Sequence, residues 1–152
     1  MAKDDIYLNV YGSVVKYLRD QIDLIKTYGY SDNLDFRDID GHAEDAVLPN
    51  KDFILLKDFS GVFDVHLNDW AMLVGISTFE DENMFRHRQI MNEMLKALMP
   101  TSVINLYDHT SLKPLRGNLV VTSDTTVNPF SKYNTRAVQF ILVGAVSSET
   151  TP

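Results

Sequence analysis

The chain has 152 residues, of which 45% are hydrophobic and 23% charged, and it contains no cysteine. This composition is typical of one globular domain over residues 1–152, and the lack of cysteine excludes disulfides, thiolate nucleophiles and Cys-type zinc sites. The net charge of −7 disfavours sequence-independent nucleic-acid binding, which needs a basic surface. The polar N-terminus and short apolar runs predict a protein with neither a secretory signal nor a membrane span.

The first predicted element is an amphipathic helix over residues 4–28. Its apolar residues recur at steps of three and four and are Tyr7, Tyr11, Val14, Leu18, Ile22 and Ile25. Gly29 is a plausible stop for this helix. The stripe predicts a core-facing side, and the charged residues between its members are expected to face water.

Residues 31–50 hold six acidic residues and one arginine, and they follow neither a helical nor a strand period. We expect an acidic loop here, because a loop of this length in a compact domain is usually functional or mobile. Asp35, Asp38 and Asp40 lie in its middle and are candidates for an oligomer interface or for the lining of a channel.

Three strands are predicted between residues 53 and 79. Residues 53–58 are continuously apolar, Ser60-Gly61 gives a turn signal, and residues 62–67 alternate apolar and polar. A second turn is expected at Asn68-Asp69, and the strand that begins at Trp70 is apolar on both faces. These runs predict an antiparallel meander.

A second helix is predicted between this meander and Pro100. Ser77 and Glu80 have the spacing of a capping box at its start. The expected apolar positions are Met84, Met91, Leu95 and Leu98. Arg86 and Arg88 form a small basic group on this helix, suited to a phosphate or to the acidic loop of a partner subunit.

Strands are predicted at residues 103–108, 119–122 and 136–147 in the last third of the chain. The segment 136–147 is apolar on both faces, which is typical of a central strand. Residues 123–135 read as a polar loop and residues 148–152 as a disordered tail. The order of elements predicts an α+β fold, with a mainly antiparallel sheet of five to six strands and two helices packed on one face.

Residue chemistry gives weak support to catalysis. Two Asp/His pairs, Asp64 with His66 and Asp108 with His109, would suit a small metal-dependent hydrolase if they met in space. The chain has neither a Gly-x-Ser-x-Gly motif nor a glycine-rich phosphate loop. We therefore predict no enzyme, no catalytic residue, no metal site and no cofactor.

The sequence of elements resembles the tail terminator, or tail completion, proteins of tailed bacteriophages. The resemblance comes from the first helix, the meander, the helix after Ser77, and three closing segments. Those segments are VINLYD at 103–108, LVVT at 119–122 and RAVQFILV at 136–143. It covers most of the chain as an architecture, without a diagnostic motif.

The resemblance implies a structural virion protein that forms a homohexameric ring, caps the tail tube and joins the tail to the neck. Its partners would be its own copies, the tail tube and neck or connector proteins. DNA would pass through the ring without specific binding. The protein would be assembled in the host cytoplasm and reside at the head–tail junction of the virion.

Two other readings remain open beside the hydrolase. One is a different head–tail connector or neck component. The other is a monomeric adaptor that binds a partner through a sheet edge. Native mass separates the adaptor from the ring, and metal-dependent thermal stabilisation would favour the hydrolase.

Overall fold

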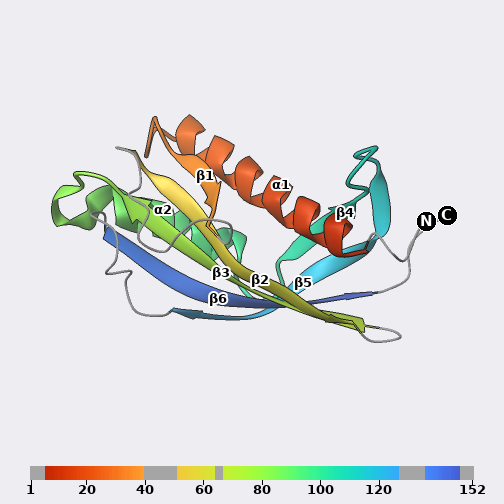
Figure 1. Cartoon of the computed structure of the whole chain (residues 1–152). Helices are drawn as coiled ribbons and strands as arrows, with labels where there is room; N and C mark the ends of the chain where they lie inside the picture. Colours follow the sequence, from red (N-terminus) through yellow and green to blue (C-terminus); the bar gives the residue numbers. More distant parts are fainter. Residues whose placement is uncertain (1–5, 40–50, 64–66, 127–135, 148–152) are drawn as a thin grey trace.

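A computed structural model describes residues 6–39, 51–63, 67–126 and 136–147 of the chain. Its elements are helix α1 (Ile6–Thr27), strands β1 (Asp35–Asp38), β2 (Phe53–Phe63) and β3 (Leu67–Thr78), helix α2 (Phe85–Ala97), and strands β4 (Val103–Tyr107), β5 (Pro114–Thr126) and β6 (Arg136–Ser147). Figure 1 shows α1 lying over the strands, with α2 near its C-terminal end. The predicted α+β class is confirmed.

The strands pair in the order β1-β2-β3-β6-β5-β4. Strand β1 is parallel to β2, whereas every other pairing is antiparallel. Strand β6 pairs with β3 along one side and with β5 along the other, so its backbone lies between them as Figure 1 also shows. The last strand of the chain thus connects the β1–β3 strands to β5 and β4.

Helix α1 is close to the prediction. Its buried apolar residues are Val10, Val14, Leu18, Ile22 and Ile25. Tyr7, expected in the stripe, is 44% exposed. The buried side packs on the face of β3 that holds Trp70, Met72, Val74 and Ile76. Residues Ile90, Met94 and Leu98 of the second helix region join the same core, so both helices bury their apolar sides in one cluster.

The predicted meander is wrong, because β2 is one long strand. The register between β2 and β3 shifts between Lys57 and Ser60, which marks a β-bulge, and Asp58 has a φ of 56°. The expected turn at Ser60-Gly61 therefore lies inside β2, and the one expected at Asn68-Asp69 lies inside β3. Ser60 and Gly61 follow the bulge and pair with Ala71 and Trp70, and Asn68 and Asp69 are paired with β2 as well, so these residue types do not mark turns here.

Part of the expected acidic loop at 31–50 is also a strand. Strand β1 pairs with the first residues of β2, with Asp35 opposite Phe53 and Asp38 opposite Leu56. Four residues are too few for a period to be recognised. Similarly, β5 extends beyond the predicted 119–122 on both sides, into the expected polar loop. Residues 40–50, 127–135 and 148–152, which complete the predicted loops and tail, lie outside the described residues.

The second helix starts later than predicted. Strand β3 continues through Ser77 and Thr78, so the Ser77–Glu80 capping box does not form. A short 3₁₀ turn (Glu82–Met84) then leads into α2. The buried side of α2 consists of His87, Ile90 and Met94, whereas Leu95 is 37% exposed. The predicted apolar stripe therefore lies on a different side of the helix from the buried one, because Met84, Met91 and Leu95 also recur at helical spacing. None of the described helices is long and apolar enough to cross a bilayer.

Candidate functional site

Arg86 lies at the centre of a network that joins three elements. Its Nε donates to Asp52 Oδ2 at 3.1 Å, and its Nη2 donates to Asp52 Oδ1 at 3.2 Å and to the carbonyl of Phe79 at 2.5 Å. Asp52 is 1% exposed and also accepts from the hydroxyl of Ser31 at 2.6 Å. The fork of Arg86 thus holds the first turn of α2 against the start of β2 and the end of β3.

Asp81 provides the helix cap that the sequence suggested at Ser77. Its carboxylate accepts from the amides of Arg86 at 3.0 Å and His87 at 2.8 Å, and from the hydroxyl of Thr78 at 3.0 Å. Burial acts to raise the pKa of Asp81, but these hydrogen bonds and the charge of Arg86 leave that pKa below its usual value. The bond to Asp52 raises the pKa of Arg86 above its usual value, although burial opposes it. Asp81 and Arg86 are therefore both charged at neutral pH.

A polar hollow of about 530 Å³ lies beside this network. It is lined by Gly29, Tyr30, Ser31, Asp32, Asn33, Phe79, Glu80 and Arg86. The side chain of Arg86 is 34% exposed, but most of its N–H groups already donate to Asp52 and Phe79. The acidic residues of the hollow are Asp32 and Glu80, and its arginine is bound to Asp52 and Phe79.

The other predicted interface residues lie apart from Arg86. Asp35 forms a surface ion pair with Lys51 at 2.8 Å, which lowers the pKa of Asp35. The carboxylate of Asp38 accepts from the hydroxyl of Tyr11 on α1. Arg88 is exposed and donates to the carbonyl of Asn83 at 2.9 Å. Asp40 lies outside the described residues.

Of the four candidate metal ligands, the structure describes Asp108 and His109. Asp108 closes a turn by accepting from the amide of Ser111 at 2.7 Å, its hydroxyl at 2.9 Å and the amide of Thr110 at 3.2 Å. These bonds lower the pKa of Asp108. The amide of His109 donates to Asn9 Oδ1 on α1 at 2.9 Å. Asp64 and His66 lie outside the described residues, and within those residues no three metal-ligating side chains cluster.

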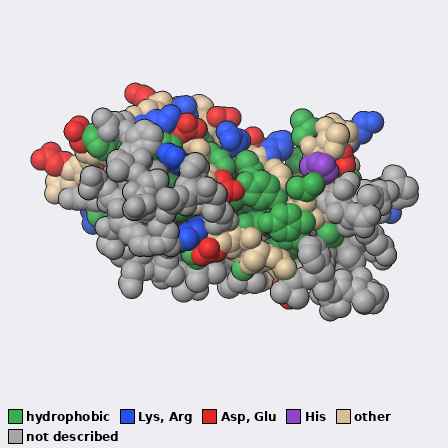
Figure 2. Space-filling model, viewed as in Figure 1, with side chains coloured by type: hydrophobic (Ala, Val, Ile, Leu, Met, Phe, Trp, Pro, Cys, Tyr) green, Lys and Arg blue, Asp and Glu red, His purple; other side chains and the backbone are tan. Residues whose placement is uncertain are grey.

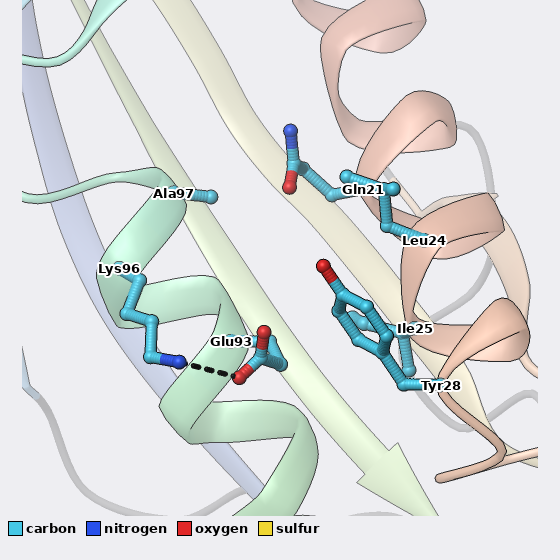
Figure 3. Close-up of a pocket in the computed structure, with 7 residues that line it drawn as sticks. All are labelled: Gln21, Leu24, Ile25, Tyr28, Glu93, Lys96 and Ala97. Carbon is cyan, nitrogen blue, oxygen red and sulfur yellow. Dashed lines mark hydrogen bonds and ion pairs between the residues drawn. The ribbon is translucent and has the colours of Figure 1, made fainter.

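A groove runs between the C-terminal half of α1 and the last turns of α2. Figure 3 shows its two walls, with the ring of Tyr28 lying across the gap towards α2. It has a volume of about 160 Å³ and is lined by Gln21, Leu24, Ile25, Tyr28, Glu93, Lys96 and Ala97. Leu24 and Tyr28 are 45% and 54% exposed. Glu93 and Lys96 pair at 3.0 Å along the opposite wall.

The face of the sheet turned away from the helices carries a row of apolar residues among polar ones such as Lys57 and Ser60, which pair with Leu73 and Ala71. Phe53 and Leu55 are buried there and form a second cluster with Ile39. On the neighbouring strand β3, Leu73 and Ala71 belong to the same face and are half-buried. The register continues this row to Ile141 and Val143, which pair with Leu73 and Ala71. In a two-layer domain such a face is usually polar.

Sequence reasoning identified Arg86 but missed both of its carboxylate partners. Asp81 carries a detectable signal, because an acid a few residues before a helix is a common cap. Asp52 has no such local signal, since the ion pair joins residues that are 34 positions apart in the sequence.

No protein-family model matches the chain, and no curated protein matches it in sequence.

Proposed function

We propose that this protein is a structural component of a tailed-bacteriophage virion, a tail terminator that forms a homohexameric ring. The ring caps the tail tube, joins the tail to the neck and lets DNA pass without specific binding. The proposal takes the strands as a single six-stranded sheet with both helices on one side. It places the protein at the head–tail junction, with tail tube and neck proteins as partners.

The observation that carries the proposal is the apolar second face of the sheet. The helices cover only the side that holds Trp70, Met72 and Val74. On the other side, Leu73 and Ala71 are half-buried and lie in register with further apolar residues of β6. Burial of apolar area contributes about 25 cal/mol per Å² to association, so a subunit of an assembly needs such a surface. The face suits contact with another protein better than contact with water.

The charged side chains support the same proposal. Asp52 and Asp81 both bind Arg86, and Asp108 closes a turn, so these charged groups stabilise the fold. The net charge of −7 suits a ring whose channel repels DNA. Asp35, Asp38 and Asp40 are the candidates for that channel lining. Replacing the three with asparagine should leave the ring intact if they line the channel, and loss of the ring would assign them to an interface.

The first test is native mass across a concentration series, followed by electron microscopy of purified tail tubes with the protein added. A hexamer that binds one end of the tube is the expected result. Leu73→Glu should abolish binding to copies or to tubes, whereas Leu8→Glu, a matched change at a site 48% exposed on α1, should not. Binding to connectors instead of tube ends would assign the protein to another neck position. A chain that binds neither itself nor tubes would overturn the proposal.

A further inference from the structure

We propose that helix α1 shields the edge strand β4 from pairing with another chain, and that exposing this edge lets β4 of two copies pair. Strands β1 and β4 are the outermost strands in the order of pairing, so among the described strands each has a neighbour on one side only. Unpaired backbone groups along such an edge are a template for strand pairing between molecules. The inference does not depend on the proposed function, because it concerns a contact that the folded chain prevents.

Two buried polar side chains of α1 bind the outer side of β4 and the residues that follow it. The amide of Tyr107 donates to the hydroxyl of Ser13 at 2.8 Å, and the amide of His109 donates to Asn9 Oδ1 at 2.9 Å. The amide of Asp108, between them, donates at 2.9 Å to the segment that leads into β5. Successive backbone amides of a strand point to opposite sides, so those of Tyr107 and His109 belong to the outer edge. Helix α1 thus occupies two amides that an added strand would need.

This shielding shortens the edge that remains open. Val103 is 47% exposed and Asn105 is exposed as well, and their amides point the same way as that of Tyr107. The open part, from Val103 to Asn105, is about 10 Å long, whereas the whole edge, from Val103 to His109, is about 23 Å long. Strands in globular proteins are usually about 17–20 Å long. The open part alone is therefore too short to hold a second strand, and the whole edge is long enough.

The opposite edge strand, β1, is protected in other ways. It has four residues. The amide of Phe36 donates to Asp35 Oδ1 at 2.8 Å, and the hydroxyl of Tyr11 on α1 bonds to the carboxylate of Asp38. Arg19 of α1 lies over the ring of Phe36, 5.0 Å from its centroid. Short length and charged side chains are common protections of an edge, so β4 is the edge whose protection depends on α1.

Helix α1 reaches both edges because the residues that do so lie on different sides of the helix. Asn9 and Ser13 contact β4 and its continuation, whereas Tyr11 and Arg19 contact β1. A helix repeats every 3.6 residues, so Asn9 and Ser13 share one side and the other two residues lie on another. Figure 1 shows α1 between β1 and β4. The hydroxyl of Ser13 also donates to the carbonyl of Asn9 at 2.6 Å, which links the two shielding residues.

A second copy of the chain supplies a strand that fits an exposed β4 edge. In an antiparallel pair centred on Leu106, Asn105 of one copy would face Tyr107 of the other, and Val103 would face His109. Both edges then present the same outward amides and carbonyls, so the two strands are complementary. Between residues 103 and 109 this register places no like charges opposite each other. The expected product is therefore a β4–β4 pair between two copies.

The test compares full-length variants that remove hydrogen bonds between α1 and backbone groups. Asn9→Ala combined with Ser13→Ala frees the two outer-edge amides. Tyr17→Phe is the matched control, because the Tyr17 hydroxyl donates to the carbonyl of Ala97, which lies in neither edge strand. We expect the double variant to form intermolecular β-sheet about 10-fold faster or more than the control, because two lost bonds favour detachment of α1 from the edge. Infrared spectroscopy and thioflavin T binding measure this association. Adding Asn105→Pro should abolish it, since proline lacks the outward amide.

Two outcomes would overturn the inference. The first is a double variant that forms intermolecular β-sheet no faster than Tyr17→Phe. The second is association that persists with Asn105→Pro, which would assign the contact to another strand. Circular dichroism verifies that each variant is folded; Ser13→Ala alone replaces an unfolded double variant, and Asn105→Lys replaces an unfolded proline variant, because an edge lysine also opposes strand pairing. Both readouts report strand pairing between chains, so a ring held together by other contacts leaves them unchanged.

Discussion

Gly61 is the position where an added methyl group should do most damage. It lies opposite Trp70 across the β2–β3 pair, and a Cβ built on it would stand 2.3 Å from Cε3 and 2.4 Å from Cζ3 of the indole. The indole has no easy escape, because Trp70 is 2% exposed and stacks on Phe59 at a centroid distance of 5.4 Å. Tyr7 contacts the same ring at 5.9 Å. The Gly61→Ala change therefore forces the strand or the aromatic cluster to move.

Overpacking of this kind costs about 1–3 kcal/mol, and the pinned indole favours the upper part of that range. For a chain of this length, each kcal/mol lowers the melting temperature by about 2–4 °C. We expect Gly61→Ala to melt about 4–10 °C below the wild type. Gly12→Ala is the matched control, because its added Cβ meets only His109 Cβ at 3.9 Å. In a helix that change should stabilise the protein by about 0.5–1 kcal/mol.

The assay is thermal unfolding by circular dichroism, combined with the fluorescence of the only tryptophan in the chain. Because Trp70 is that residue, its emission reports directly on the position next to Gly61. Gly61→Ala should lower the melting temperature and shift the emission, whereas Gly12→Ala should raise the melting temperature and leave the emission unchanged. Equal melting temperatures and spectra for Gly61→Ala and the wild type would refute the packing of Trp70 on Gly61.

Three further substitutions test the polar links of the fold. Ser13→Ala should cost about 1–3 kcal/mol, because the Ser13 hydroxyl is buried and accepts from a β4 amide at 2.8 Å; Thr27→Ala, which removes a similar but exposed hydroxyl bond within α1, should change unfolding in urea very little. Asp81→Asn should destabilise the start of α2 by about 1 kcal/mol at pH 7, because each carboxylate oxygen accepts from a backbone amide and an NH2 group would replace one of them. The pKa of Asp81 is lowered in the folded state, so the stabilisation by its carboxylate is present above the pKa of the unfolded chain and is lost as pH falls through the pKa of the folded protein. The melting temperatures of Asp81→Asn and the wild type should therefore converge between pH 7 and pH 3, and a constant difference between them would contradict the reasoning. Asp52→Asn should lower the free energy of unfolding by about 2–3 kcal/mol in chemical denaturation, since it leaves the partly buried Arg86 without its carboxylate partner. Arg86→Lys should also be destabilising in that assay, because a lysine cannot form the two parallel hydrogen bonds that Arg86 makes to Asp52.

The sequence predicts best the elements whose apolar pattern extends over many residues. Helix α1 repeats its apolar stripe over six turns, so one misplaced tyrosine does not alter the prediction. Strand β6 has the predicted bounds, because apolar residues occupy both of its faces over most of its length. The errors occur where one short signal has two meanings. Ser60-Gly61 is typical of a turn, yet here the glycine makes room for an indole on the facing strand, which no local pattern reveals.

The candidate site was less predictable, because it depends on contacts between distant segments. Arg86 stands out in the sequence as part of a basic group, but its meaning changes once Asp52 is found 34 residues away. The α1–α2 groove depends on how two helices lie against one sheet, which their individual stripes do not specify. The apolar second face of β3 was recognised in advance, because its residues alternate within a single strand.

Leu112, in the turn between β4 and β5, is unfavourable for the stability of the fold. Its φ is 61°, a conformation that costs a non-glycine residue about 1 kcal/mol or more, and its side chain is mostly exposed. Glycine or asparagine would fit this backbone better in an isolated subunit. A leucine at this position therefore combines an unfavourable backbone conformation with an apolar side chain left in contact with water.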